Sequence, residues 1–267
     1  MKMLVCVKQV PDTAEIRIDP VKNTLIRDGV PSIVNPYDAY ALEMAARIKD
    51  ASPGSEIVLL SMGPEQAKSA LKECLSVGGD RAILLSDRAF GGSDASATSY
   101  ILATAIKKLE AEEGAFDLIF CGKQSIDGDT AQVGPKIAEH LGIPQITYAI
   151  DTMVDGDLVK VRREVDEGFE LIAAKMPCLV TVTKPFYEPR FPTIRSKMTA
   201  NRKEITVYTC ADFDGIDTAA IGLTGSPTKV KDTFTPPVKS GCVMIHEETG
   251  ADSAMKLFGA LVEADAL

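Results

Sequence analysis

Residues 117 to 141 read DLIFCGKQSIDGDTAQVGPKIAEHL, and this stretch decides the fold. Its first five residues are expected to form a buried strand, because Asp117 is followed by the apolar run from Leu118 to Cys121. A polar loop follows from Gly122 to Asp129, and the residues from Thr130 to about Leu141 have the apolar spacing of a helix. A strand, a loop and a helix in this order form the repeating unit of an α/β sheet.

The same unit recurs on the N-terminal side of this stretch. The expected strands there cover residues 3–7, 56–61 and 82–85. The expected helices begin at Asn35-Pro36, after Gly63-Pro64 and after a polar loop over residues 87–93. A small hairpin is predicted over residues 16–26. Four alternations of strand and helix predict a parallel sheet with right-handed crossovers.

The pattern changes after Gln145, where strand-like runs dominate. These runs cover residues 146–150, 158–165, 169–173, 179–183 and 205–208. Residues 223–238 are rich in Thr and Pro, and a final helix over 253–264 places Met255, Phe258, Leu261 and Val262 on one face. We therefore expect an α/β fold with a doubly wound, mainly parallel sheet and a strand-rich second half. The expected domains are residues 1–222 and an extended arm over 223–267 that wraps another subunit.

Composition narrows the class of protein. The chain has 267 residues, 45% of them hydrophobic, no Trp and a formal net charge of −9. An acidic chain repels phosphate backbones, so we expect no nucleic-acid partner. No run approaches the ~20 apolar residues of a membrane span, so we expect a cytoplasmic protein without membrane insertion. The six cysteines contain no C-x-x-C pair, so we expect reduced thiols packed as small hydrophobes and no metal site.

Ligands of open parallel sheets bind beyond the carboxyl ends of the strands. Three loops qualify, over residues 8–13, 62–64 and 122–130. In the third, glycines allow close approach of the backbone, and Asp129 with Gln132 has capping-box spacing. The N–H groups of the following helix would then face an anion such as a phosphate. The alternative is an ordinary capped helix after a strand.

Other motifs point away from catalysis by side chains. There is no G-x-G-x-x-G after the first strand and no G-x-x-x-x-G-K-[ST], which argues against a Rossmann dinucleotide site and a Walker-type nucleotidase. Gly91-Gly92-Ser93-Asp94 only partly resembles a pyrophosphatase loop and follows the third strand rather than the first. His140 and His246 pair with no nucleophile. We expect no catalytic side chain.

Residues 184–203 differ in charge from the rest of the chain. Six basic residues stand against one acid, Glu188, and apolar residues alternate with them. The apolar members are Phe186, Tyr187, Phe191, Ile194 and Met198. Three prolines prevent regular strand pairing. A solvated loop with its apolar residues tucked inward is one interpretation; a docking site with an apolar anchor inside a charged rim is the one we favour.

Four segments of the chain are informative together: Val5-Cys6-Val7-Lys8-Gln9-Val10-Pro11-Asp12, Asn35-Pro36-Tyr37-Asp38, Gly122-Lys123-Gln124-Ser125-Ile126-Asp127 and Glu188-Pro189-Arg190-Phe191-Pro192-Thr193-Ile194. Together they resemble the beta subunit of electron transfer flavoproteins. They occur in the family's order and spacing over about residues 1 to 210. Ser125 replaces the family's usual Ala, and Asp166-Glu167-Gly168 replaces its usual Asp-Gly-Gly.

The resemblance implies a heterodimer with an alpha subunit that carries a mobile flavin domain. It implies that residues 1–222 bind an adenine nucleotide and that the chain is an electron carrier, active only in a complex. The nucleotide contacts that it implies are Cys6, Asn35, Met62, Gly122, Asp127, Gly128, Asp129, Thr130, Ala131 and Gln132. The partner-docking residues that it implies are Arg190, Phe191, Ile194 and Met198.

The subtype depends on the nucleotide. Residues 128–135, GDTAQVGP, resemble the bifurcating group, in which FAD takes a hydride from NADH. Its electrons then go to the alpha-subunit flavin with an acyl-CoA dehydrogenase-type partner, and to a low-potential acceptor such as ferredoxin or flavodoxin. The first alternative is a shuttle-type subunit with structural AMP that carries electrons from acyl-CoA dehydrogenases. The second is a nucleotide-sensing binding module.

Overall fold

The computed structural model describes residues 1–12, 31–231 and 241–267. The chain divides into two compact units. The first unit comprises Met1–Arg17 with Leu25–Lys231, and the second comprises Ile18–Thr24 with Asp232–Leu267. The hairpin predicted over residues 16–26 and the middle of the predicted arm, residues 232–240, lie outside the described residues.

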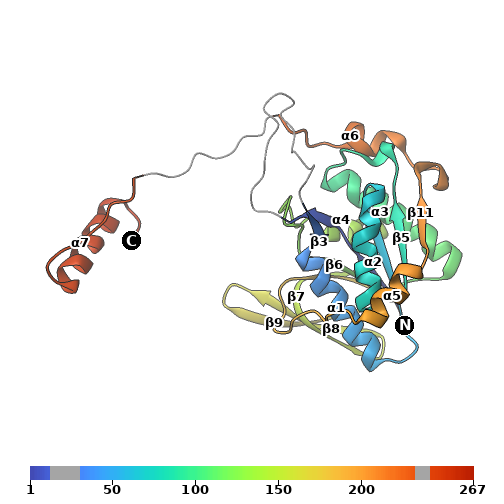
Figure 1. The fold of residues 1–267 in the computed structure, drawn as a ribbon, viewed down its shortest axis with the longest axis horizontal. Helices are drawn as coiled ribbons and strands as arrows, with labels where there is room; N and C mark the ends of the chain where they lie inside the picture. The colour runs from blue at the N-terminus through green and yellow to red at the C-terminus, as the bar shows by residue number, and fades with distance from the viewer. Residues whose placement is uncertain (13–30, 232–240) are drawn as a thin grey trace. The chain divides into compact units, whose positions relative to one another are not determined.

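A nine-stranded sheet forms the centre of the first unit (Figure 1). Its order is β11 (Ile205–Tyr208), β5 (Arg81–Leu85), β4 (Glu56–Met62), β1 (Lys2–Cys6), β6 (Leu118–Gly122), β10 (Cys178–Val182), β7 (Gln145–Asp155), β8 (Leu158–Val165) and β9 (Gly168–Lys175). All pairs from β11 to β7 are parallel, and β8 and β9 extend the sheet in antiparallel fashion. A separate antiparallel ribbon joins β2 (Gln9–Pro11) to β3 (Ser32–Val34). The predicted α/β fold with a strand-rich second half is confirmed.

Helices cover both faces of this sheet. Their bounds are α1 (Pro36–Ala51), α2 (Lys68–Val77), α3 (Ala95–Glu113), α4 (Val133–Leu141), α5 (Ile194–Arg202) and α6 (Gly222–Gly225). Val5 and Leu59 pack with α1 and α2 in one buried cluster, whereas Leu4 and Leu60 pack with α3 and α4 in the other. Successive residues of one strand point to opposite faces, so each central strand must be apolar throughout. That is why these strands read as continuous apolar runs.

The strand order reverses beside β1. The chain passes from β1 to β4 and β5 on one side, and then returns to β6 on the other side of β1. Val5 pairs with Leu59 of β4 and with Phe120 of β6. The carboxyl ends of β1 and β6 therefore flank the switch point, where open α/β sheets bind ligands.

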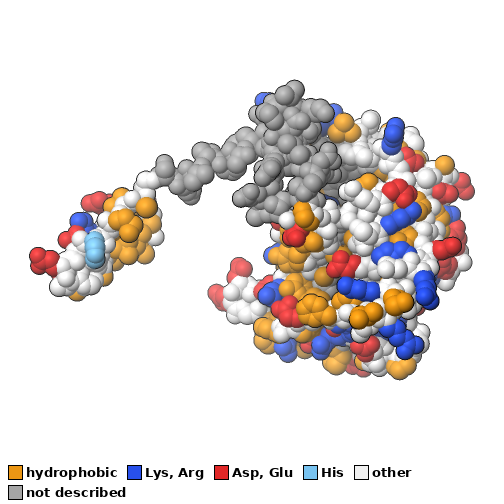
Figure 2. All heavy atoms as spheres, viewed as in Figure 1, with side chains coloured by type: hydrophobic (Ala, Val, Ile, Leu, Met, Phe, Trp, Pro, Cys, Tyr) orange, Lys and Arg blue, Asp and Glu red, His pale blue; other side chains and the backbone are white. Residues whose placement is uncertain are grey.

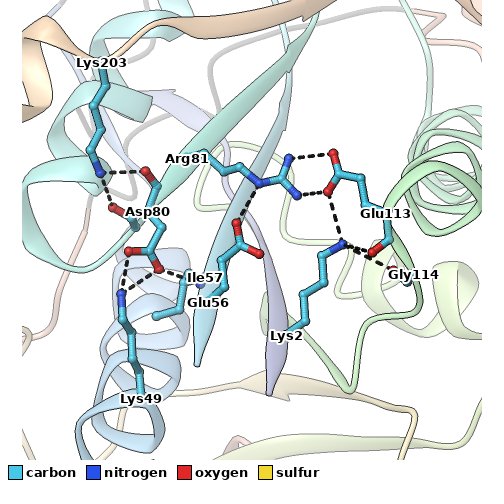
Figure 3. A network of polar contacts seen from close by, with 10 residues as sticks. Lys2, Lys49, Glu56, Ile57, Asp80, Arg81, Glu113, Gly114 and Lys203 are labelled. Atoms are coloured by element: carbon cyan, nitrogen blue, oxygen red, sulfur yellow. Dashed lines mark hydrogen bonds and ion pairs between the residues drawn. The ribbon is translucent and has the colours of Figure 1, made fainter. Parts of the chain in front are cut away.

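The opposite edge of the sheet carries a network of ion pairs (Figure 3). Arg81 Nε lies 2.8 Å from Glu56 Oε1, and its guanidinium also contacts Glu113. Lys2 Nζ lies 3.1 Å from the same Glu113 carboxylate. Lys2, Glu56 and Arg81 are the first residues of β1, β4 and β5, and Glu113 is the last residue of α3. The network therefore joins the amino ends of these strands, whereas the switch point lies at their carboxyl ends.

Most cysteines are packed as expected, but two are not. Cys6, Cys74, Cys121 and Cys178 are buried free thiols. Cys210 is half-buried and Cys242, in the second unit, is exposed, so the expectation of six packed thiols is wrong for these two. No helix in the described ranges has the length and apolar character needed to cross a bilayer.

The described part of the second unit contains one helix, α7 (Gly250–Glu263). Thr249 caps it by accepting a hydrogen bond from Asp252 N at 3.1 Å. Within this unit, Met255, Leu257, Phe258 and Val262 are exposed. The amphipathic helix predicted over residues 253–264 is confirmed, and it begins three residues earlier because Thr249 supplies the cap.

Candidate functional site

Two loops meet at the switch point through an ion pair. Lys8, just after β1, places its Nζ 2.6 and 2.9 Å from the two carboxylate oxygens of Asp127, in the loop after β6. The same Nζ lies 3.3 Å from Ser125 Oγ. Burial opposes the charged form of Asp127, but the hydrogen bond and charge of Lys8 hold the pKa of its carboxyl below the ordinary value. The pair therefore fixes the β6 loop against the end of β1.

Asn35 binds the same loop with its side chain. Its Nδ2 donates to Gln124 O at 2.8 Å, and Ile126 N donates to its Oδ1 at 3.2 Å. Its own N–H donates to Lys8 O at 2.9 Å. Asn35 does precede the first turn of α1, as the sequence predicts, but its side chain makes no capping hydrogen bond. The asparagine is used to shape the loop after β6 rather than to cap the helix.

Asp38 is a buried carboxylate that joins both loops. Lys8 N donates to Asp38 Oδ2 at 2.7 Å, and Gly122 N donates to Oδ1 at 3.1 Å. Burial raises the pKa of Asp38 to about 7, although these N–H donors favour its charged form. Gly122 has no room for a side chain: a Cβ there would meet Asp38 Oδ1 and would lie 2.7 Å from Tyr37 Cβ. Glycine at this position is required by the close approach of α1.

The sequence reasoning missed Lys8, Asp38 and Ser125 as site residues. A signal for Asp38 was present, since residues 38, 41, 42 and 45 share one helical face and the other three are buried alanine or leucine. A carboxylate in such a buried row needs hydrogen-bond donors aimed at it. Lys8 and Ser125 do lie in two of the predicted ligand loops, but their pairing depends on how these loops meet.

The helix after the loop begins later than predicted. The sequence analysis starts it at Thr130 with an Asp129–Gln132 capping box, and this is wrong: α4 begins at Val133, and Gln132 makes no side-chain cap. Asp129 Oδ1 instead accepts a hydrogen bond from Gln124 Nε2 at 2.7 Å. Asp129 and Ala131 have φ values of 51° and 53°, in the left-handed region. A helix start without a side-chain cap leaves the N–H groups of Val133 and Gly134 to face an anion, whereas Pro135 has none.

The loop itself is tightly turned around Ser125. Gly128 N and Asp129 N donate to Ser125 O at 3.2 and 2.9 Å. A Cβ on Gly128 would lie 3.3 Å from Ser125 Oγ, so the loop is close-packed on that side. The chain from Ile126 to Thr130 is exposed or half-buried. An exposed glycine-containing loop, next to an uncapped helix start and a lysine, fits the phosphate groups of a nucleotide.

The remaining predicted nucleotide contacts lie along the same edge. Cys6 ends β1, Met62 ends the neighbouring β4 and Gly122 ends β6. Cys6 is close to Cys121, and their hydrogen bond raises the pKa of the Cys121 thiol well above its ordinary value. The neutral Cys121 thiol adds no negative charge to the carboxyl edge.

The docking segment, residues 184–203, follows β10 and includes α5. Phe191 is 90% and Ile194 82% exposed, and Phe186 and Met198 are also exposed. Lys and Arg side chains lie beside hydrophobic ones over this part of the surface (Figure 2). Arg190 differs from the other predicted docking residues, because its guanidinium packs against α1 rather than reaching outward. Among the described residues, no group of three His, Cys, Asp or Glu could hold a metal ion.

Comparison with known proteins decides the family. The electron transfer flavoprotein domain matches residues 22–213. Electron transfer flavoprotein subunit beta of Megasphaera elsdenii is 57% identical over 257 residues, covering 96% of this chain and 95% of its own length. This chain belongs to the electron transfer flavoprotein beta-subunit family. The equivalent subunit of Clostridium acetobutylicum is 53% identical over 239 residues, covering 90% of each chain.

A third relative extends the family to a different type of complex. It is the caffeyl-CoA reductase-Etf complex subunit CarD of Acetobacterium woodii, 47% identical over 263 residues and 98% of each chain. Membership of this beta-subunit family confirms the resemblance and places the protein in electron transport. It also implies a flavin or nucleotide cofactor and a companion subunit.

Proposed function

We propose that this beta subunit binds FAD at the switch point and works as the bifurcating half of a heterodimer with an alpha subunit. The observation that carries the proposal is the start of α4, which has no side-chain cap, beside Gly128, at the edge where the Lys8–Asp127 pair joins the two loops. When bound there, FAD would supply the chemistry that accepts a hydride from NADH and separates the two electrons.

The residues of the chain would bind and orient the cofactor. The backbone of residues 127–132 would hold the diphosphate, since the start of α4 lacks a side-chain cap and Gly128 carries no side chain. Cys6 and Met62, at the ends of β1 and β4, would contact the adenosine end. Asn35 and Asp38 would hold the two loops at a fixed separation. No side chain is assigned as acid, base or nucleophile.

The docking segment would deliver electrons to a flavoenzyme of the acyl-CoA dehydrogenase type. Ile194 would be the apolar anchor, with Phe191 and Met198 beside it. CarD, a relative at 47% identity, is described as part of a caffeyl-CoA reductase complex, which supports a partner that acts on CoA esters. A low-potential acceptor such as ferredoxin or flavodoxin would take the other electron. The proposed place of this reaction is the cytoplasm.

The arm over residues 223–267 would hold the alpha subunit. The exposed apolar face of α7 suits burial against another chain. The proposed division is therefore a nucleotide-binding domain over 1–222 and a partner-binding arm after it.

A shuttle-type subunit with AMP is the second candidate. One phosphate is enough to satisfy the N–H groups at the start of α4, so the uncapped helix alone does not require a diphosphate. The nucleotide-sensing module is less favoured, since it leaves the exposed apolar docking segment without a role.

Nucleotide extraction from the purified heterodimer tests the proposal. FAD on both subunits, together with rapid reduction by NADH, is the expected result. AMP in place of the second FAD would overturn it in favour of the shuttle type. Either nucleotide on an isolated beta subunit that forms no heterodimer would favour the sensing module.

A further inference from the structure

Arg190 anchors the docking segment to two carboxylates of α1. Arg190 N donates to Glu43 Oε2 at 3.0 Å, Arg190 Nε donates to the same oxygen at 2.7 Å, and Nη2 donates to Oε1 at 3.1 Å. Nη2 also lies 2.9 Å from Asp50 Oδ2. The Glu43 side chain is only 7% exposed. A buried carboxylate that accepts one main-chain and two guanidinium hydrogen bonds fixes both the backbone and the side chain of residue 190.

The anchoring residues form one stripe on α1. Glu43, Arg47 and Asp50 are spaced four and three residues apart, so they share a helical face. Arg47 stacks on the ring of Tyr187, 4.1 Å from its centroid. The stripe therefore holds the segment at two points, Tyr187 and Arg190, on either side of Glu188-Pro189.

The far end of the segment is held by α2 and the start of β5. Lys72 Nζ, from α2, donates to Ala200 O and Asn201 O at 3.1 Å each, and so binds the last carbonyls of α5. Lys203 Nζ donates to Asp80 O at 2.6 Å and to Gly79 O at 3.3 Å (Figure 3). At the start of α5, Thr193 and Ser196 form a reciprocal capping box. The C-terminal end of α5 is thus fixed to α2 and to the residues before β5, and its start is closed by its own cap.

Between these anchor points the apolar residues face outward. Phe191 follows Arg190 directly, and Ile194, three residues later, begins α5. Both side chains are almost fully exposed. A Pro-rich loop that was free to move would bury such side chains against the nearest apolar surface, at the cost of its docking role. The hydrogen bonds between Arg190 and Glu43 oppose such a rearrangement, because they fix the backbone next to Phe191.

We propose that Glu43 and Arg190 are positioning residues that preset the docking segment, so that Phe191 and Ile194 meet the partner flavoenzyme without prior ordering of the loop. This rests on the proposed docking role of the segment. Pre-ordering lowers the cost of association, because less conformational freedom is lost on binding. If the competent fraction of the segment falls to about one tenth, the apparent Kd for the partner rises about tenfold.

The test compares three classes of variant in the complete heterodimer, with a purified acyl-CoA dehydrogenase from the same organism as the probe. Arg190→Gln and Glu43→Gln break the anchor. Arg81→Gln is the matched control, because Arg81 has a side-chain exposure of 32% against 34% for Arg190 and also bridges two carboxylates, Glu56 and Glu113, neither of which belongs to α1 or to the docking segment. Ile194→Asp removes the docking anchor itself.

The expected result is a KM for the dehydrogenase raised about tenfold in both anchor variants, with kcat at saturating dehydrogenase unchanged. Amide hydrogen exchange over residues 186–193 should become faster in these variants alone. The double variant should raise the KM no more than either single variant does, because both substitutions remove the same ion pair. Arg81→Gln should leave the KM and the local exchange as they are.

Two outcomes separate the inference from the proposed function. If Ile194→Asp leaves the KM unchanged, the docking surface itself is misassigned and the inference falls with it. If Ile194→Asp raises the KM while Arg190→Gln changes neither the KM nor the exchange, docking stands and the positioning role is overturned. Should Glu43→Gln fail to fold, Arg190→Gln gives both readouts, since Arg190 is only half-buried.

Discussion

Asp38 and Gly122 are 84 residues apart in the chain, and a hydrogen bond of 3.1 Å joins Gly122 N to Asp38 Oδ1. The carboxylate also accepts the N–H of Lys8. One buried acid thus connects α1 with the ends of β1 and β6, the two strands that flank the candidate nucleotide site. The protonation state of Asp38 should therefore affect the measured stability of the folded protein.

The first prediction concerns pH. The pKa of Asp38 is raised to about 7 in the folded protein, whereas an unfolded aspartate titrates near 3.9. A raised folded pKa means that the contribution of the group is fully present below the unfolded pKa and is lost as pH rises through the folded one. From about pH 4 to about pH 7, the wild type should therefore lose stability relative to Asp38→Asn, by up to about 4 kcal/mol.

Thermal unfolding of both heterodimers at pH 5, 6, 7 and 8 measures this effect. The difference in Tm should shift in favour of Asp38→Asn as the pH rises. A difference that stays constant over this range would show that Asp38 is ionised throughout, held by its two N–H donors.

The second prediction concerns the nucleotide. Gly128→Asp adds a negative charge beside the expected diphosphate, and like charges ~4 Å apart repel by about 1 kcal/mol in water and about 4 kcal/mol at an effective dielectric near 20. A loss of ~3 kcal/mol lowers affinity more than a hundredfold. The variant should lose the beta-subunit FAD and its rapid reduction by NADH, while it keeps the alpha-subunit flavin.

Gly128→Ala separates the charge from the added bulk. Its Cβ would lie 3.3 Å from Ser125 Oγ, which a small shift of the hydroxyl can relieve. We expect this variant to retain most of its FAD. Full retention of both flavins by Gly128→Asp would remove the physical support for the bifurcating assignment.

The third prediction concerns docking. Ile194 is 82% exposed and central to the docking segment. Anchor residues of this kind contribute about 2 kcal/mol or more, so Ile194→Asp should weaken binding of the partner dehydrogenase about thirtyfold. Electron transfer to the dehydrogenase is measured by stopped flow, with flavin content and NADH reduction as internal controls. Ile194→Val should transfer electrons normally, since it keeps an apolar surface.

The fourth prediction concerns the arm. Ser226 Oγ accepts from Asp94 N at 2.8 Å, and Thr228 N donates to Asp94 Oδ2 at 2.9 Å, so the chain is bound to the first unit as far as these residues. A truncation after Lys231 removes the second unit's C-terminal part without breaking these contacts. We expect a folded beta subunit and a large loss of heterodimer in size-exclusion chromatography.

A pair of point variants localises that effect. Phe258→Glu places a charge among the exposed apolar residues of α7, and Lys256→Glu places one on its polar side. Only the first should reduce assembly. Equal assembly by the wild type, the truncated chain and both variants would show that the arm does not hold the alpha subunit.

The contacts of Asp94 also explain Gly91-Gly92-Ser93-Asp94, the loop that partly resembles a nucleotide motif. Asp94 Oδ1 caps α3 through Ser96 N and Ala97 N, while Ser93 Oγ accepts from Gly222 N at 3.0 Å. The short polar side chains serve a helix cap and the path of the C-terminal chain. The sequence alone could exclude the motif only by its position after the third strand.

The sequence by itself determined the order of strands and helices in the main sheet, but it did not predict the β2–β3 ribbon. Strand runs such as residues 3–7 and 118–121 are apolar throughout because both faces of a parallel sheet are covered, and this signal is local. It also located the loop after β6 and the exposed character of Phe191 and Ile194, since glycines, prolines and clustered charge act within a few residues of themselves. It predicted two helix caps wrongly. Asn35 and Asp129 are good capping residues, yet the side chain of each makes its hydrogen bond with Gln124 instead.

Only the tertiary structure decided which of these groups meet. Lys8 pairs with Asp127 across 119 residues, and Arg190 reaches Glu43 across 147. Such pairs form because the strand order brings β1 beside β6 and because β10 leads the docking segment back over α1. The energy that selects a partner for a buried charge comes from the local geometry of donors and the exclusion of water, and neither exists until the chain has folded.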